Sequence, residues 1–457
     1  MSEQIPPPSR RSYLTSLYQS LGFRTVVIAL LVLLMLIPLF MVENIVRERN
    51  SYHQQVLQDI AATWGGKQTL VGPVMVLPYV EHFTSVDTVT DKDGESRIVS
   101  KDIYNDRTAI LLPENLEIRA DIKEEHRQRG IYDALVYTAN LSLTGKFDHA
   151  VLLQGNAEGE RRILWDKAFI MIGVSDTKAI DTASGFMLDD GRIGLEPGTR
   201  IPALLPAGFH APLPANNNTA TSHDFKLTMS LRGSDSLLFA PLGKTTKARM
   251  TSSWTHPSFQ GELLPDKREI NDQGFNAEWD IPHLARNYPQ HWVVEDKQDY
   301  KLNEFTAGVS LYEPVSLYTQ TARAVKYAIL FVGLTFLAFF AFEISLKRRF
   351  HSLQYGLVGV ALALFYLILL ALAEHIGFLY AYLAAASTTV LLITGYLRAI
   401  LREKWRTLGI FLLLSALYGL LYLLLQMEDY ALLVGVGLLL LATGTLMYVT
   451  RHLPQAD

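Results

Sequence analysis

The feature that most constrains the fold of this chain is an apolar stretch, residues 352–397, that is broken at one point. Its two apolar runs, 352–373 and 376–397, are each about 22 residues long, enough for a helix to cross a hydrocarbon core of about 30 Å. Only Glu374 and His375 separate the two runs. We therefore expect a tight hairpin of two transmembrane helices that turns at Glu374.

Basic residues lie at both outer ends of this hairpin. They are Lys347, Arg348 and Arg349 before it, and Arg398, Arg402, Lys404 and Arg406 after it. Because cytoplasmic loops collect Lys and Arg, both outer ends are predicted to lie in the cytoplasm and Glu374 outside. The whole chain has a formal charge of −4, so this clustering indicates orientation and not a nucleic-acid partner.

Further apolar runs complete the predicted membrane domain, at 25–42, 325–344, 407–426 and 431–450. The first run is too long for a cleaved signal sequence and no small-x-small site follows it, so we interpret it as an uncleaved anchor that Pro38 kinks. The expected fold is a polytopic α-helical membrane protein with six transmembrane helices. Its N-terminal tail, 1–24, which contains a short interfacial helix, and its C-terminal tail, 451–457, are predicted to be cytoplasmic.

Residues 43–324 have an ordinary soluble composition and are expected to form one large extracytoplasmic domain between the first two spans. At its start, Tyr52, Val56, Ile60 and Trp64 repeat at every fourth residue. Gly65-Gly66 follows, which predicts a helix that ends near residue 64. Two interpretations are open: one helix from about residue 25 to residue 64, or a separate amphipathic helix after a break.

Most of the domain after residue 67 alternates apolar and polar residues, the pattern of half-buried antiparallel strands. The alternating apolar positions are Leu116, Ile118, Ala120 and Ile122; Leu135, Tyr137, Ala139, Leu141 and Leu143; Phe225, Leu227, Met229 and Leu231; and Phe305, Ala307, Val309 and Leu311. We predict a β-rich domain, mainly β or α+β, built as a sandwich or as two smaller sheets. Asp93-Gly94 is typical of a hairpin tip, and 205–221, rich in Pro, Ala and Asn, is typical of a loop.

The short motifs of the domain favour turns over binding sites. Cysteine is absent, which excludes disulfides, thiolate catalysis and Cys-ligated metals. Gly243-Lys244-Thr245-Thr246 lacks the first glycine of a phosphate-binding loop, because Leu238 stands there. Asp91 and Asp93 lack the preceding carboxylate of a calcium loop, because Val89 stands there. We expect a turn between strands at each motif.

The histidines and serines of the domain likewise lack a catalytic or metal-binding pattern. The histidines His210, His223, His256, His283 and His291 have no metal-ligand spacing, and Ser234, Ser236 and Ser258 lie in no nucleophile elbow. We therefore predict no catalytic, cofactor-binding or metal-binding residue, no cofactor, and a protein that is not an enzyme.

Ionisable residues fall at the edges of the predicted spans, which argues against a proton-coupled transporter. They are Glu343 with Lys347, Glu374 with His375, and Glu428 with Asp429. At the outer edge, Arg323 and Lys326 are expected to form an interfacial ion-pair cluster with Glu374 and Glu428. We interpret Tyr366, Tyr382 and Thr388 as packing or interface residues, with a substrate path as the alternative.

Long segments of the chain carry a more specific signal. They are GPVMVLPY at 72–79, PSFQGELLP at 257–265, GFNAEW at 274–279, RAVKYAILFVGLTF at 323–336 and QYGLVGVALALFYLILLALAEHIGF at 354–378. These segments resemble the CreD family of bacterial inner-membrane proteins. The resemblance extends from about residue 66 to residue 397, and it is thin in the N-terminal tail, in 205–221 and after Arg398.

The resemblance implies a multi-pass protein of the bacterial inner membrane that contributes to cell envelope integrity. The family is associated with the output of the Cre two-component system, envelope stress, colicin tolerance and β-lactam responses, and no catalytic residue comes with it. We expect a non-catalytic protein with a periplasmic domain that binds or senses an unknown periplasmic or membrane protein. The alternative is a transport or mechanotransmission subunit that resembles an ABC-type permease in topology. Besides the lipid bilayer and that protein, the sequence indicates no nucleic acid and no small-molecule substrate.

Overall fold

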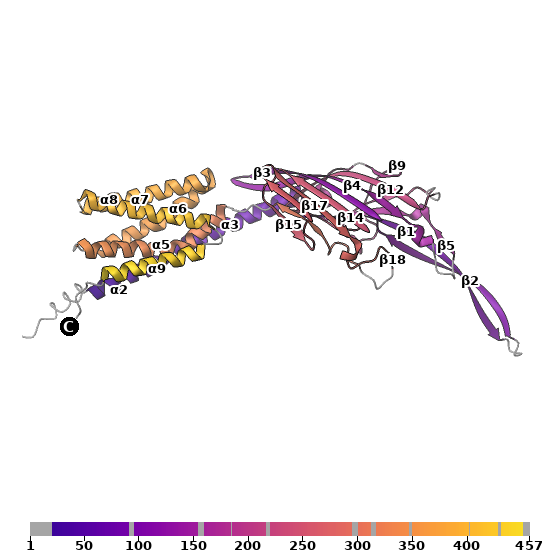
Figure 1. Cartoon of the computed structure of the whole chain (residues 1–457), viewed down its shortest axis with the longest axis horizontal. Helices are drawn as coiled ribbons and strands as arrows, with labels where there is room; N and C mark the ends of the chain where they lie inside the picture. Colours follow the sequence, from indigo (N-terminus) through magenta and orange to yellow (C-terminus); the bar gives the residue numbers. More distant parts are fainter. Residues whose placement is uncertain are drawn as a thin grey trace, which may run out of the picture. The chain divides into compact units, whose positions relative to one another are not determined.

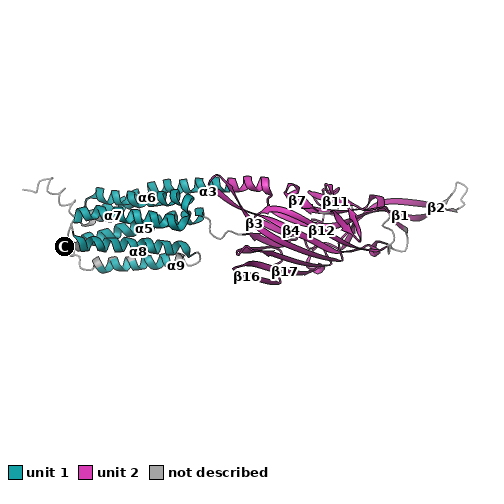
Figure 2. Cartoon of the chain, turned by 90° about the horizontal axis from the view of Figure 1, so that it is seen from above, with its two compact units in different colours: residues 1–54, 315–457 teal, residues 55–314 magenta. Residues whose placement is uncertain are grey.

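The computed structural model describes residues 21–90, 96–153, 160–183, 185–215, 220–294, 300–311, 317–346, 350–401, 403–427 and 431–450. The chain divides into two compact units (Figure 2): unit 1 comprises residues 1–54 and 315–457, and unit 2 comprises residues 55–314. Unit 1 is helical and unit 2 is rich in β-strands (Figure 1). The predicted β-rich region between the first helix and the later helices is therefore confirmed.

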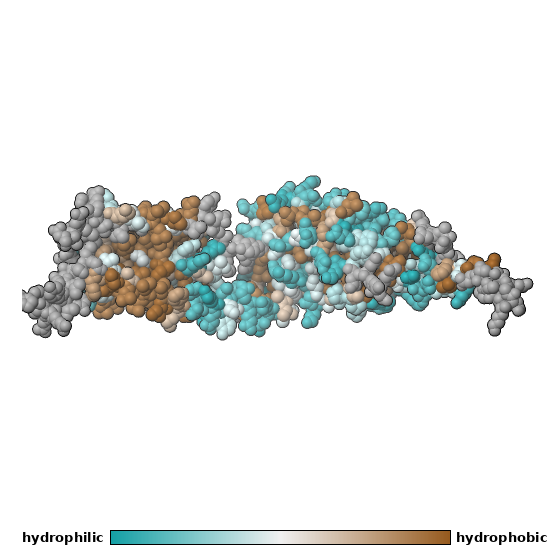
Figure 3. Space-filling view, turned by 90° about the horizontal axis from the view of Figure 1, so that it is seen from below, coloured by the Kyte–Doolittle hydropathy of each residue, from teal (hydrophilic) through white to brown (hydrophobic). Residues whose placement is uncertain are grey.

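Unit 1 is a bundle of long apolar helices. Its helices are α2 (Leu21–Leu34), α3 (Leu36–Trp64, as far as residue 54), α5 (Leu317–Leu346), α6 (Ser352–Ile376), α7 (Phe378–Leu401), α8 (Lys404–Gln426) and α9 (Ala431–Thr450). Figure 3 shows apolar side chains over most of the visible face of these helices, whereas the visible face of unit 2 is mainly hydrophilic.

Five helices among the described residues are long and apolar enough to cross a membrane. They are Thr25–Trp64, Leu317–Glu343, Ser352–Ile376, Phe378–Leu401 and Lys404–Gln426. In α9 the corresponding apolar stretch is Leu433–Thr445, which is shorter. The prediction that the hairpin turns at Glu374 is wrong by three residues: Glu374 and His375 lie in the last turn of α6, and the turn is at Gly377, whose φ of +78° favours glycine.

The first helix is interrupted once and then continues into unit 2. α2 ends at Leu34 and α3 begins at Leu36. Pro38 has no N–H, so the carbonyl of Leu34 cannot accept the usual helical hydrogen bond from that position. From Leu36 to Trp64 the backbone is one helix. The predicted segment around residues 52–64 is therefore not a separate helix after a break, and the one interruption, at Met35, lies inside the apolar run. The boundary between the units falls inside α3, after Gln54.

Unit 2 contains two sheets. Sheet A has ten strands: β1 (Gln68–Thr90), β2 (Ser96–Leu111), β5 (Glu160–Ile163), β6 (Phe169–Val174), β10 (Glu196–Pro197), β11 (Gly208–Pro212), β13 (Ser236–Phe239), β15 (Pro257–Gly261), β18 (His291–Val293) and β19 (Ala307–Leu311). Sheet B has nine: β3 (Asn115–Arg129), β4 (Tyr132–Asp148), β7 (Ile180–Ala183), β8 (Phe186–Leu188), β9 (Gly191–Ile193), β12 (Ser222–Ser234), β14 (Thr245–Ser252), β16 (Lys267–Asn271) and β17 (Gly274–Pro282). Short helices connect some of them: α4 (Ala150–Leu153), η1 (Trp165–Lys167), η2 (Thr177–Ala179) and η3 (His283–Ala285).

One hydrophobic core contains residues of both sheets, so the two sheets form a sandwich. The predicted alternation is confirmed in β3, where Leu116, Ile118, Ala120 and Ile122 are buried, and it recurs in β12. β4 departs from it, because Val136 is fully buried although it points away from the core residue Tyr137.

β1 and β2 form a long antiparallel ribbon that extends beyond the other strands of unit 2 (Figure 1). The ribbon pairs from Met75 and Leu111 to Thr90 and Ser96. The predicted tip at Asp93-Gly94 lies outside the described residues, as does the predicted helix of the N-terminal tail.

The prediction of a loop at 205–221 is wrong for part of that segment. Gly208–Pro212 forms β11, which pairs with β6 and β10. Phe209 and Ala211 are buried in the core. The strand was not predicted because it is short and has glycine at its start and proline at its end, two residues with a weak preference for strands. Burial against β6 outweighs that weak preference.

Candidate functional site

The last turns of α3 dock on β4, on the face that points away from the core of unit 2. Ile60 is 8% exposed and forms a small cluster with the buried residues Ala134 and Val136. Partly buried Val56, Leu57 and Trp64 surround this cluster. Docking by α3 explains why β4 buries residues on both faces, because Ala134 and Val136 would otherwise face water.

The predicted stripe of four residues is wrong at its first position. Tyr52 is 51% exposed and lies in unit 1, whereas His53 beside it is buried. A step of four residues turns an α-helix by about 400°, so each step drifts by about 40° and three steps displace Tyr52 far from the Trp64 face.

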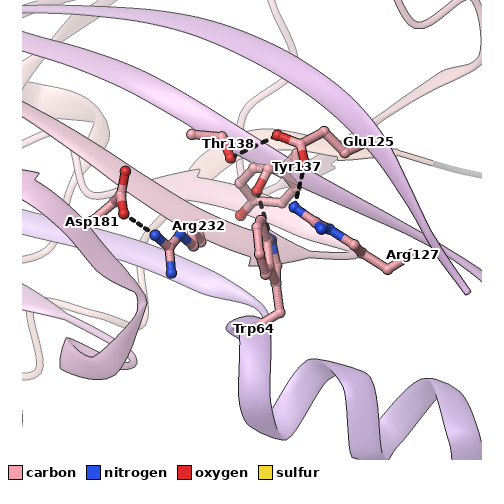
Figure 4. Close-up of polar contacts among 7 residues, drawn as sticks. All are labelled: Trp64, Glu125, Arg127, Tyr137, Thr138, Asp181 and Arg232. Atoms are coloured by element: carbon pink, nitrogen blue, oxygen red, sulfur yellow. Dashed lines mark hydrogen bonds and ion pairs between the residues drawn. The ribbon is translucent and has the colours of Figure 1, made fainter. Parts of the chain in front are cut away.

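Trp64, the last residue of α3, is held between two arginines of sheet B (Figure 4). The guanidinium carbon of Arg127 lies 4.1 Å from the ring centroid of Trp64, and that of Arg232 lies 4.8 Å from it. Figure 4 shows the two side chains on opposite sides of the indole. Trp64 Nε1 also donates to the carbonyl of Tyr137 at 3.4 Å. We call Trp64, Arg127 and Arg232 the helix clamp.

Carboxylates fix both arginines of the helix clamp. Arg127 donates to Glu125 at 2.8 Å, and Arg232 forms a close ion pair with Asp181 of β7 (Figure 4). Near the clamp, Arg129 pairs with Asp59 of α3 at 3.0 Å. Each exposed cation–π contact stabilises by about 0.5–1 kcal/mol, so the clamp holds the helix end by several modest interactions.

Gly65 makes the sharp exit from α3 possible. Its φ is +138°, and a Cβ at this position would lie 2.8 Å from the carbonyl oxygen of Arg232. The end of β12 contacts the same place, because Ser234 Oγ donates to the carbonyl of Gly65 at 3.0 Å. Glycine is therefore required where the chain passes from helix to sheet.

Tyr137 connects the helix clamp to both sheets. Its carbonyl accepts from Trp64, and its hydroxyl donates to the carbonyl of Ser236 in sheet A at 2.7 Å. Burial, with a smaller contribution from Asp235, raises the pKa of Tyr137 above its ordinary value. The hydroxyl therefore stays protonated at neutral pH and keeps its donor role.

A pocket of about 1020 Å³ lies elsewhere in unit 2, beside β1, β2 and β5. Its lining includes His82, Tyr104, Arg161, Arg162 and, from the segments around β5, His149, Trp165 and Asp166. We call this the outer pocket. It combines cationic, aromatic and hydrogen-bonding side chains, a combination that is typical of ligand-binding sites.

His149, which lines the outer pocket, stacks on the imidazole of His223. The rings of His149 and His223 lie 5.5 Å apart and nearly parallel, and Trp165 meets His149 edge-on at 5.0 Å. His223 Nδ1 lies 2.8 Å from Asp189 Oδ2. Burial, and then the proximity of His223, lowers the pKa of His149. His149 is therefore neutral at neutral pH.

The other histidines named from the sequence have separate surroundings. His210 Nδ1 lies 2.6 Å from the carbonyl of Gly198, and His283 Nδ1 lies 3.3 Å from that of Lys244. His256 accepts from Trp254 through its carbonyl, and His291 is exposed in β18. Among the described residues, no three His, Asp or Glu side chains are grouped to hold a metal ion.

The remaining motifs serve the fold. Gly243 and Lys244 lie in the turn between β13 and β14, where the Gly243 N–H donates to Thr246 Oγ1 at 2.9 Å. Ser234, Ser236 and Ser258 lie in strands β12, β13 and β15. Asp91 and Asp93 lie outside the described residues.

In unit 1 the edge carboxylates accept hydrogen bonds from tyrosines. Tyr355 donates to Glu343 at 2.9 Å, and Tyr318 donates to Glu374 at 3.0 Å. Glu343 is buried, 5% exposed. Arg323 and Lys326 lie in α5. The other proposed partners, Lys347, Glu428 and Asp429, lie outside the described residues.

The tyrosines expected to pack inside unit 1 do so. Tyr366 and Tyr382 are each 2% exposed, and Tyr382 donates to the carbonyl of Tyr418 at 2.6 Å. Thr388 is exposed, whereas its neighbour Thr389 is buried. The three residues therefore do not line a common path.

Sequence reasoning missed Arg127, Arg232, His149 and Arg162. Trp64 was the only signal for the helix clamp, and nothing in the sequence places Arg232 beside it. His149 stands alone between β4 and α4, without any spacing to another histidine that predicts their stacking.

Comparison with known proteins decides the family. The family model described as "Inner membrane protein CreD" matches residues 20–454. The chain belongs to the CreD family. It is also 35% identical over 424 residues to the "Inner membrane protein CreD" of Escherichia coli (strain K12), covering 92% of this chain and 91% of that relative. The resemblance found in the sequence is thereby confirmed, and this CreD-family chain is an inner-membrane protein with several apolar helices.

Proposed function

We propose that this CreD-family protein is a non-catalytic component of cell envelope integrity and the envelope stress response, whose unit 2 binds or senses an envelope component. Its family membership and its apolar helices support a place in the inner membrane. The outer pocket supports binding, because it gathers arginine, histidine and aromatic side chains on one side of unit 2.

The proposed topology has six spans, with both termini in the cytoplasm and unit 2 in the periplasm. The Lys and Arg clusters around 347–349 and 398–406 support this orientation. The five long apolar helices supply five of the spans, and α9 is the proposed sixth. Both connections of unit 2 to the helices then leave from the same side of the membrane.

The helix clamp carries the proposed mechanism. α3 contributes residues to both units as one helix, and its end is fixed to sheet B by Trp64, Arg127 and Arg232. A helix fixed at its end to a folded domain moves with that domain. We propose that α3 transmits a binding event in unit 2 to the membrane helices.

The function is tested in the native organism with a deletion strain under envelope stress, such as a β-lactam or a colicin. The strain is expected to differ from its parent in survival, and the wild-type gene to restore the parental response. Trp64→Ala is expected to restore it poorly at equal protein level, whereas the control Tyr52→Ala, an exposed aromatic of the same helix, restores it fully. A deletion strain that survives like its parent under these stresses contradicts the proposed role.

A further inference from the structure

The outer pocket is built on one face of three paired strands, β5, β1 and β2. Arg162 lies opposite Val80, and His82 lies opposite Tyr104. Opposed residues on neighbouring strands point to the same face, and so do residues two positions apart on one strand. Arg162, His82 and Tyr104 therefore share the face that lines the pocket.

The two arginines of the outer pocket differ in their surroundings. Arg161 pairs with Glu81 at 3.0 Å, and its guanidinium carbon lies 5.5 Å from the ring centroid of Tyr79. Arg162 points to the opposite face, is exposed, and forms no ion pair with a carboxylate among the described residues. A guanidinium binds a carboxylate or phosphate through two parallel hydrogen bonds, so Arg162 has the chemistry that an anionic ligand group requires.

An aromatic surface lies on the same face. The ring of Tyr104 is 67% exposed and stacks on His82 at 4.7 Å. Asp102 Oδ1 lies 3.3 Å from His82 Nε2. Stacking restrains the tyrosine ring, which then presents a flat apolar face with a hydroxyl at its edge.

Hydrogen-bonding groups complete the outer pocket. Asp166 is an exposed lining residue and accepts hydrogen bonds, and His149 lines the pocket with only 3% of its surface exposed and with an Nδ1 that has no hydrogen-bond partner among the described residues. A ligand hydroxyl donates to a carboxylate and both donates to and accepts from a neutral imidazole. A second anion on the ligand would be repelled by Asp166. The set therefore favours one anionic group accompanied by hydroxyls.

We propose that the outer pocket binds an anionic saccharide, a ligand that carries a carboxylate or phosphate together with several hydroxyls. Arg162 binds the anion, Tyr104 covers the apolar face of a sugar ring, and Asp166 and His149 bind hydroxyls. The volume of about 1020 Å³ accommodates more than one sugar unit, since sites for small ligands have about 300–1,000 Å³. This inference rests on the proposed function and names the ligand class of unit 2.

Calorimetric titration of the full-length protein in detergent tests the proposal. The probes are a trisaccharide that carries a single glucuronate carboxylate, glucose 6-phosphate, neutral maltotriose and inorganic phosphate. We expect an acidic saccharide to bind at least about tenfold more tightly than maltotriose and than inorganic phosphate. The tighter of the two acidic probes shows whether the anion is a carboxylate or a phosphate.

Variants assign the binding to the outer pocket. Arg162→Gln and Tyr104→Ala are each expected to weaken binding about tenfold, whereas Arg268→Gln, an exposed arginine of β16 in the other sheet, leaves it unchanged. Maltotriose or phosphate binding as tightly as the acidic saccharides, binding that ignores both variants, or no binding of any probe would each overturn the proposal. The titration uses purified protein, so its failure is distinct from a failure of the stress phenotype.

Discussion

The guanidinium carbon of Arg127 lies 4.1 Å from the ring centroid of Trp64, the last residue of α3. Arg127 belongs to β3 of sheet B, and Arg232 of β12 approaches the same indole at 4.8 Å. The end of a helix that begins in unit 1 is therefore fixed by side chains of two strands that are far apart in the sequence. Side chains of unit 2 therefore bind the end of α3 at a defined position.

Trp64→Ala should loosen the end of α3. Removing a half-buried indole with its two cation–π contacts is expected to cost roughly 2 kcal/mol. Hydrogen exchange of the backbone amides of 56–64 in the full-length protein should then accelerate about 30-fold, if these amides exchange by release of the helix end. Tyr52→Ala should leave the exchange of 56–64 unchanged, since that side chain is 51% exposed. Unaltered exchange in Trp64→Ala would show that the apolar contacts of Ile60 suffice.

The contact between Arg127 and Trp64 should appear as a coupling energy. We expect a double-mutant cycle with Arg127→Gln and Trp64→Leu to give about 0.5–1 kcal/mol in the free energy of unfolding. The matched cycle uses Arg119→Gln, because Arg119 of the same strand is exposed and pairs with Glu117. That cycle should give a value near zero, and equal values in the two cycles would contradict a specific cation–π contact.

Acid should weaken unit 2 through His149. Its pKa is lowered in the folded protein by burial and then by His223, while Asp148 acts in the opposite direction. As the pH falls below about 6.5, the unfolded chain binds a proton that the folded chain does not, so the free energy of unfolding decreases. The loss is at most about 1.4 kcal/mol per pH unit for one group.

His149→Gln removes this proton and should flatten the pH dependence. The free energy of unfolding, measured by denaturant at pH 7.5 and pH 5.5, should fall less in the variant than in the wild type. The quantity compared is the change in the free energy of unfolding between pH 7.5 and pH 5.5. A loss of stability that is equal at both pH values in the variant therefore does not affect the comparison. An identical fall in both proteins would show that other groups determine the acid sensitivity.

The orientation of the spans has its own test. Alkaline phosphatase fused after Gly94 or Asn216 should be active, because unit 2 is proposed to lie in the periplasm. Fusions after Arg349, after Arg402 and at the C-terminus should be inactive. Activity after Arg402 would contradict the six-span topology.

Periodicity alone predicted much of the fold, because an element that buries one face has apolar residues at a regular spacing in the sequence. The apolar runs around Glu374 gave the hairpin of α6 and α7, and the alternation in 116–122 gave β3. A prediction from alternating residues fails for a strand such as β4, whose two faces are buried by different parts of the structure. Val136 is buried by α3 and not by the sandwich core, and only the docked helix makes that visible.

The candidate sites could not be predicted, because they depend on which strands become neighbours. β1 pairs in parallel with β13, joining Gln68 to Leu237, and pairing of this kind has no signature in the segments themselves. The outer pocket likewise depends on Arg162 lying opposite Val80. In the β1–β13 pairing and in the outer pocket alike, the neighbours of each residue are set by the order of the strands and not by its own segment of sequence.

The central claim is that α3 transmits between unit 2 and the membrane helices as an intact helix. Asn50 and Ser51 are exposed positions of α3, and glycine costs about 1 kcal/mol at each relative to alanine. Asn50→Gly with Ser51→Gly therefore weakens the helix without changing its length, and Asn50→Ala with Ser51→Ala is the matched control. The decisive measurement is survival of the complemented deletion strain under envelope stress, at equal protein levels in the membrane. The account predicts full survival with the alanine pair and impaired survival with the glycine pair, and full survival with both pairs would contradict it.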